Sequence, residues 1–197
     1  MALKKGTEIP TIDVVLVTVT AGAKELAIDT ANKIAVEVAS QTEDAVQLIV
    51  KGKLISQKKA KMTITGHNIT LTDNVFNYEL AKILQGGTIY YWQDEDKTTK
   101  TKEETEFGIA GYEPPVVGSD DTGEVFVLNA YSAVYDEAGN ITEYEKISYP
   151  NCTGNPFGLS SEDNVFRVQE QVINSAPAKG QAPYTLDRVS ELPDVTE

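Results

Sequence analysis

The sequence predicts a mainly β protein, a β-sandwich or barrel-like subunit that carries one internal α-helix at about residues 74–85. Two observations support this class. Most segments between turn residues alternate apolar and polar side chains, which is the pattern of a strand with one buried face. Only one segment has apolar residues at helical spacing, and it lies between capping residues and a Gly-Gly pair. We therefore expect sheets with a single helix packed against them.

Before the helix, four segments are expected to form strands: 12–20, 33–40, 44–55 and 61–72. The first is rich in Val and Thr on both faces, which indicates burial on both sides. The other three alternate, and the basic segment 57–61 is expected to be a loop tip between two long strands. Gly66 interrupts the last alternation, which predicts a bulge or bend there.

The helix has a start signal, an apolar stripe and a stop signal. Asp73 or Asn74 can cap its first turn by accepting free backbone N–H groups. Gly86-Gly87 can end it, because glycine adopts the left-handed conformation at little cost. About eleven residues are marginal as a free helix, so the helix must pack on a sheet. Its packing face is expected to be Phe76, Leu80, Ile83 and Leu84.

After the helix, strands are expected at 88–93, 105–112, 124–135, 141–149 and 164–174. The intervening 94–104 segment is a charged loop, 136–140 is a hairpin turn, and 150–161 is irregular. The domain organisation that follows is an N-terminal arm at 1–11, a β domain with one helix at 12–174, and a C-terminal tail at 175–197. The tail can pack on the domain through a short strand near 184–189.

Composition excludes several classes of function. The 197 residues carry a net charge of −13, which disfavours binding to nucleic-acid phosphates and to anionic membranes. One cysteine allows no intrachain disulfide. The start of the chain does not resemble a signal peptide, and the apolar run at 14–19 is too short to span a bilayer. The expectation is a soluble protein made in a cytoplasm.

The sequence contains no recognisable catalytic set. His67 is the only histidine and is expected in the middle of a strand, while Cys152 is expected in an irregular loop. Together they cannot form a four-ligand zinc site of the usual N/S type. The acidic segment 119–123 matches a calcium loop only weakly, and no phosphate-binding loop is present. We therefore expect no catalytic residue, no cofactor, no metal and no enzymatic activity.

Four segments nevertheless carry a resemblance: the helix with its flanks at 71–88, Gly154-Asn-Pro-Phe-Gly158, and the segments 164–175 and 183–187. Over roughly residues 10–190 the chain resembles the major tail tube proteins of long-tailed bacteriophages and of phage-tail-like bacteriocins. The resemblance implies a tail-tube-like β-sandwich subunit that forms hexameric rings, with the helix outside. The rings would stack into a hollow tube that conducts DNA without binding it specifically.

The same resemblance implies partners and a location. The partners would be further copies of the chain together with tape-measure, tail-tip and tail-terminator proteins. The location would be the virion tail, assembled in the cytoplasm of a bacterial host.

Charge suggests which residues make contacts in such an assembly. The basic cluster of Lys58, Lys59 and Lys61 is the natural partner for an acidic loop of a neighbouring subunit, with Asp94, Glu95 and Asp96 as candidates. An acidic lumen wall would let phosphates pass without sticking, and its candidates are Glu37, Glu43 and Asp44.

Other functions remain open at this point. One is a different virion component, such as a head-decoration or tail-completion protein. Another is a carbohydrate-binding β-sandwich that would use the aromatic strand Tyr90-Tyr91-Trp92 as a platform.

Overall fold

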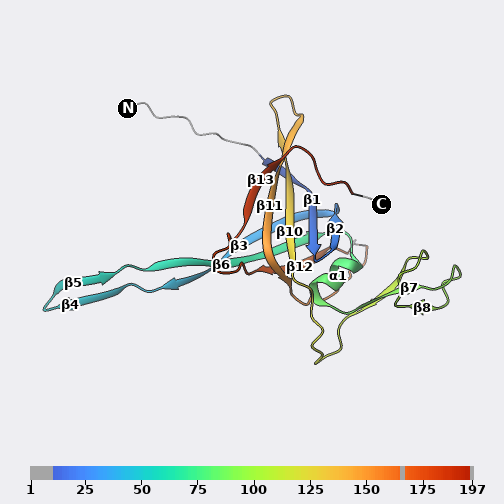
Figure 1. Cartoon of the computed structure of the whole chain (residues 1–197), viewed down its shortest axis with the longest axis horizontal. Coiled ribbons are helices and arrows are strands. Elements are labelled where there is room, and N and C mark those ends of the chain that lie inside the picture. The colour runs from blue at the N-terminus through green and yellow to red at the C-terminus, as the bar shows by residue number, and fades with distance from the viewer. Residues whose placement is uncertain (1–10, 165–166, 196–197) are drawn as a thin grey trace.

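The computed structural model describes residues 11–164 and 167–195 as antiparallel β-sheets with one short helix (Figure 1). The prediction of a mainly β protein with one helix is confirmed. Most of the expected N-terminal arm, residues 1–10, lies outside the described residues. Within them, α1 spans Tyr78–Gln85, and the strands are β1 (Thr11–Ala21), β2 (Lys24–Ile28), β3 (Ala31–Glu43), β4 (Val46–Val50), β5 (Lys53–Lys58), β6 (Lys61–Asp73), β7 (Thr88–Trp92), β8 (Lys100–Thr101), β9 (Ile109–Glu113), β10 (Phe126–Tyr135), β11 (Ile141–Gly154), β12 (Gln169–Ser175) and β13 (Thr185–Val189).

The main sheet has the order β2-β1-β10-β11-β12-β6-β3, with β13 also paired to β11. Strand β11 joins its two halves, because most of β11 pairs with β10 whereas Cys152–Gly154 pairs with β12. Leu16 and Val17 are both buried, as expected for a first strand covered on both sides. Side chains from both halves meet in one hydrophobic core, which includes Val17, Val19, Ile69, Leu71, Phe126, Leu128 and Ile173.

Helix α1 begins later than predicted because its cap is Asn77. The Asn77 side-chain oxygen accepts hydrogen bonds from the backbone N–H groups of Glu79 and Leu80, both at 3.0 Å. The prediction that Asp73 or Asn74 is the cap was wrong. Asp73 pairs in register with strands on both of its sides, so it stays in β6 and the helix cannot start there.

The predicted packing face is largely confirmed. Leu80, Ile83 and Leu84 are buried and belong to the hydrophobic core. Phe76 precedes the helix instead of lying on it. Its half-buried ring packs edge-on against Phe157, with ring centroids 6.2 Å apart.

The end of the helix is held by glycines, as predicted. Gly86 has a φ of 82° and its N–H donates to the Lys82 carbonyl at 2.9 Å. A β-carbon on Gly154 would lie 2.5 Å from the Leu84 Cα, so only glycine lets β11 approach the helix this closely. The Phe157 N–H also donates to the Gln85 side chain at 3.3 Å. The 154–158 motif therefore fixes the helix end against the sheet.

Two features project from the main sheet on opposite sides. The arm, defined as residues 40–65, is a hairpin formed by the outer parts of β3 and β6 together with β4 and β5. The lobe, defined as residues 88–113, contains the three-stranded sheet β8-β7-β9. Figure 1 shows the arm and the lobe at opposite ends of the longest axis of the molecule.

Several expected boundaries differ from the structure. The segment 44–55 is interrupted by a turn at Lys51-Gly52. The segment 150–161 is not irregular throughout, since β11 continues to Gly154. In the 164–174 segment, β12 begins only at Gln169, and residues 165–166 lie outside the described ones. Within the C-terminal segment, β13 pairs with β11 along the main sheet.

Candidate assembly surface

The arm exposes an unusual amount of apolar surface. Every residue from 40 to 65 is exposed. Monomeric soluble proteins rarely expose large apolar patches, and large exposed patches mark candidate interaction sites. Eight large apolar side chains on the arm are between 47% and 71% exposed: Val46, Leu48, Ile49, Val50, Leu54, Ile55, Met62 and Ile64.

Strand register carries the apolar stripe of the core out onto the arm. The bulge predicted at Gly66 is confirmed, because the pairing of β6 with β3 shifts by one residue next to it. On the core side of the bulge Val36 lies opposite Ile69, and beyond it Thr42 lies opposite Met62. Directly paired residues share a face of the sheet. The shift therefore brings the even-numbered Met62 onto the same face as the odd-numbered Ile69.

The true tip of the arm is a tight turn at Lys51-Gly52. Both residues have positive φ values, 49° and 78°, as a two-residue hairpin turn of the favoured kind requires. Ile49 pairs directly with Leu54 just behind the turn, and Lys53 pairs with Val50. The tip therefore combines exposed aliphatic side chains with two lysines.

The prediction that the basic segment 57–61 forms the loop tip was wrong. Lys58 ends β5, Lys61 begins β6, and Lys59 lies between them, so all three lie along the side of the arm. The turn lies nearer the N-terminus, at Lys51-Gly52, because glycine readily adopts a positive φ. Gly52 was therefore a turn signal already present in the sequence. Lys58 forms an exposed salt bridge with Glu43 at 2.8 Å. Whether these lysines contact a neighbouring subunit remains a prediction.

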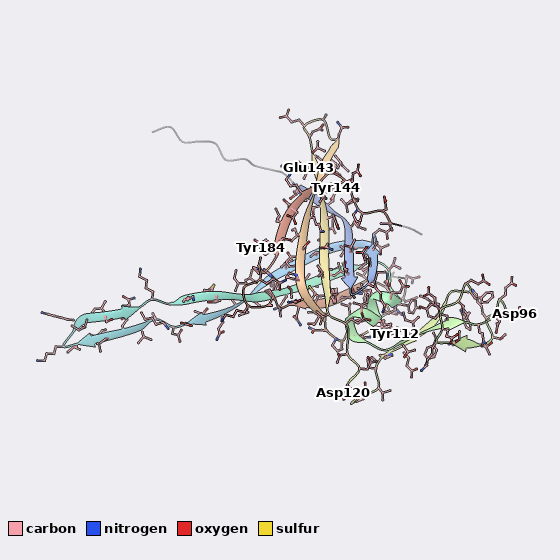
Figure 2. All side chains as sticks on the ribbon, viewed as in Figure 1. Asp96, Tyr112, Asp120, Glu143, Tyr144 and Tyr184 are labelled. Carbon is pink, nitrogen blue, oxygen red and sulfur yellow. The ribbon has the colours of Figure 1, made fainter. Side chains whose placement is uncertain are left out.

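The acidic loop candidates lie on the lobe and differ in their surroundings. Hydrogen bonds from the Thr98 N–H and from the Thr99 and Thr98 hydroxyls lower the pKa of Asp94 to about 2. Asp94 therefore organises its own loop. Glu95 and Asp96 are exposed, and Figure 2 shows Asp96 at the outer end of the lobe.

The three lumen candidates are all exposed and lie along β3 and its continuation. Glu37 lies opposite Asn68 on the sheet, whereas Glu43 and Asp44 lie on the arm. Glu43 is paired with Lys58, so its charge is partly balanced. Their position on a lumen wall remains a prediction.

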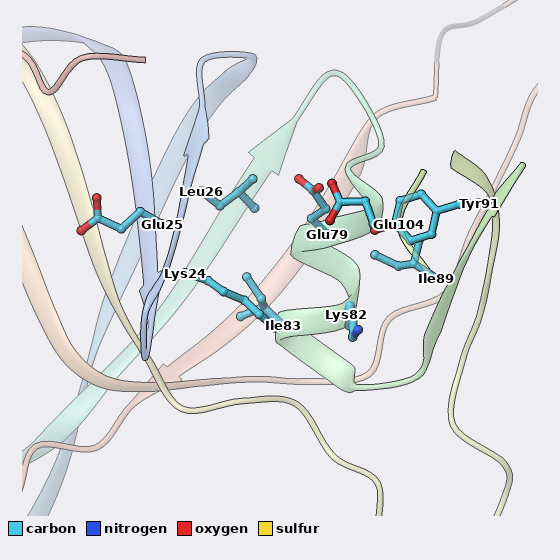
Figure 3. Close-up of a pocket in the computed structure, with 9 residues that line it drawn as sticks. All are labelled: Lys24, Glu25, Leu26, Glu79, Lys82, Ile83, Ile89, Tyr91 and Glu104. Atoms are coloured by element: carbon cyan, nitrogen blue, oxygen red, sulfur yellow. The ribbon is translucent and has the colours of Figure 1, made fainter. Parts of the chain in front are cut away.

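A groove of about 360 Å³ lies between β2, α1 and the lobe (Figure 3). The close-up shows the Glu79 and Glu104 carboxylates on the side of the groove toward Tyr91. Burial raises the pKa of Tyr91, and the negative charges of Glu104 and Glu79 raise it further. The groove thus combines apolar walls with three carboxylates and two lysines. Its lining residues are Lys24, Glu25, Leu26, Glu79, Lys82, Ile83, Ile89, Tyr91 and Glu104.

Two of the three aromatic rings of strand β7, those of Tyr90 and Trp92, each have a lysine over them. The Lys100 ammonium lies 5.5 Å from the Trp92 ring centroid, and the Lys102 ammonium lies 5.9 Å from that of Tyr90. Sugars bind aromatic platforms through open ring faces, and these faces are each approached by a lysine.

His67 and Cys152 both have structural surroundings. His67 lies in β6 as expected, is buried, and contacts Tyr149 and Tyr184 edge-on. Burial lowers its pKa. The expectation that Cys152 lies in an irregular loop was wrong, because it is buried in β11, and burial raises the pKa of its thiol to about 11. In the acidic segment 119–123, Asp121 accepts the Gly87 N–H at 3.0 Å.

No protein-family model matches the sequence, and no curated protein matches it. Across residues 11–164 and 167–195, the structure has no helix with the length and apolar character needed to cross a membrane.

Proposed function

We propose that this chain is a structural subunit that assembles with copies of itself through the arm. More specifically, we propose that it is a major tail tube protein, whose hexameric rings stack into a hollow conduit for DNA in a virion tail. The observation that supports it is the arm, whose exposed apolar side chains gain little from the fold of a single subunit.

The energetics of the arm favour a partner. Burial of apolar surface contributes roughly 25 cal/mol per Å², and none of the arm's eight large apolar side chains is buried in the isolated chain. An isolated two-stranded hairpin is at best marginally stable in water. Within the described part of the chain, the outermost strands of the main sheet, β2 and β3, each also have one edge without a strand partner. Association with further copies would bury the arm and cover these edges together.

The charge of the chain is compatible with a conduit. With 30 acidic and 17 basic residues, most surfaces repel phosphate. We place Glu37, Glu43 and Asp44 on the lumen wall. DNA would pass such a wall without binding, because binding of phosphates depends on basic side chains that release their counterions. The tape-measure, tail-tip and tail-terminator proteins would then meet the tube inside it and at its two ends.

Substitutions in the arm test the proposal. The triple variant Leu48→Ser, Ile49→Ser, Leu54→Ser removes three side chains that are 54–58% exposed. It should keep the thermal midpoint of the subunit and lose assembly, measured by light scattering over a range of protein and salt concentrations. The matched control is Val116→Ser, Val117→Ser, which changes side chains 75% and 101% exposed outside the arm and should assemble normally.

Two results would count against the proposal. One is a wild-type protein that scatters as a monomer at every concentration and salt. The other is a triple variant that assembles as well as the wild type, which would show that the arm is not the contact.

A further inference from the structure

We propose that the groove between β2, α1 and the lobe receives the tip of the arm of a second copy of this chain. This inference rests on the proposed self-assembly and names the surface that the arm meets. It makes the subunit contact heterologous, with one end of the molecule binding the opposite end of the next.

The arm and the lobe carry opposite net charges. The arm contains five lysines and two acidic residues, and its outer part from Val46 to Ile64 holds all five lysines and neither acid, although the whole chain has a net charge of −13. By contrast, the lobe contains seven acidic residues and three lysines. Opposite patches steer encounter and fix the register of a contact. The basic arm and the acidic lobe therefore lie at opposite ends of the same molecule (Figure 1).

The match extends to individual side chains. Glu79 and Glu104 form no salt bridge with another described residue. Of the two lysines that line the groove, Lys24 already pairs with Glu124 at 3.1 Å, whereas Lys82 forms no salt bridge among the described residues. Lys51 and Lys53 at the arm tip likewise have no salt-bridge partner among the described residues. Docking would bring the ammonium groups of Lys51 and Lys53 next to the carboxylates of Glu79 and Glu104.

The apolar parts match as well. Ile83 and Ile89 are buried in the floor of the groove, and Leu26 lines its β2 side. A volume of about 360 Å³ lies near the lower end of the range of about 300–1,000 Å³ typical of ligand pockets. It suits a few side chains and not a whole folded element. The cross-strand pair Ile49 and Leu54 behind the turn supplies side chains of the right kind.

The arm cannot reach the groove of its own subunit. The twelve residues from Ser40 to Lys51 extend the hairpin by roughly 40 Å at about 3.3 Å per residue. Figure 1 shows that this extension leads away from α1 and the lobe. The contact must therefore join two molecules. A head-to-tail contact of this kind closes into a ring when its rotation allows, and otherwise continues as a filament.

Charge reversal at each end provides the test. The groove variant carries Glu79→Lys and Glu104→Lys, and the tip variant carries Lys51→Glu and Lys53→Glu. Each alone should weaken association by about tenfold or more, because two attractions become repulsions. An equimolar mixture should recover association, since each variant then offers an end that complements the other. The control is Glu137→Lys, Glu162→Lys, which reverses two exposed carboxylates outside the arm, the lobe and the groove and should associate as the wild type does.

Zero-length cross-linking of carboxylates to amines gives a second readout on the wild-type assembly. Mass spectrometry should identify Lys51 or Lys53 joined to Glu79 or Glu104. The inference is overturned if both reversals associate normally, if the mixture does not recover, or if the Glu137→Lys, Glu162→Lys control loses association as the two reversals do. In those cases wild-type assembly would persist and the proposed function would stand. A wild-type protein that stays monomeric would overturn both.

Discussion

Replacement of Leu80 by alanine tests how the single helix is held in place. Leu80 is fully buried in the core, and α1 has only eight residues, so its stability comes from packing rather than from its own hydrogen bonds. Truncating a buried leucine typically costs about 2–5 kcal/mol, from lost apolar burial plus the cavity left behind. For a chain of this size each kcal/mol lowers the thermal midpoint by roughly 2–4 °C. The expected decrease is therefore about 4–20 °C.

The measurement is thermal unfolding, followed by circular dichroism or calorimetry at a concentration where light scattering shows only monomer. This condition matters because association raises the apparent midpoint. Val75→Ala is the matched control, since Val75 lies just before the helix and is 54% exposed. It should change the free energy of unfolding by no more than about 0.5 kcal/mol. A Leu80→Ala midpoint equal to that of the wild type would show that the helix does not pack by this face.

Three further predictions follow from particular contacts and charges. Gly154→Ala should destabilise the fold by about 1–3 kcal/mol in urea unfolding, because its β-carbon would meet the Leu84 backbone; Gly158→Ala, whose β-carbon meets nothing within 4 Å, should be close to neutral. Equal effects of the two substitutions would contradict this account of the motif. The hydrogen bonds of Asp94 hold its pKa at about 2, against an ordinary value of 3.8, so its stabilisation of the loop is present above about pH 4 and is lost as the pH falls toward 2. NMR titration should show the Thr98 and Thr99 amide shifts changing in that window, and a midpoint near 3.8 would refute the claim. The purified protein should show no DNA binding in a polarisation assay at low ionic strength, and tight binding that weakens steeply with salt would contradict an acidic lumen.

The fold class and the helix stripe could be predicted because both depend on local periodicity. The alternation of residues 33–40 and 61–72 indicates strands, and Leu80, Ile83 and Leu84 recur at helical spacing. The helix start was missed because three Asx residues lie close together. Only the pairing of Asp73 with its neighbours in the sheet decides that Asn77 is the cap.

The surroundings of the arm could not be predicted for a different reason. An alternating strand such as 44–55 predicts one buried face, yet Val46, Leu48 and Val50 are exposed because nothing in the subunit covers them. Periodicity shows which side chains are apolar, but it does not show whether the same subunit or a partner buries them. The tip at Lys51-Gly52 carried a recognisable turn signal in Gly52, which the longer basic segment 57–61 obscured. The groove joins residues from Lys24 to Glu104, so no local pattern could reveal it.

Electron microscopy of the concentrated, purified wild-type protein tests the central claim most directly. Self-assembly through the arm predicts multi-subunit particles, and the tail-tube proposal requires them to be closed rings that stack with a hollow centre. Isolated particles the size of one 197-residue subunit, at every protein and salt concentration, would contradict it.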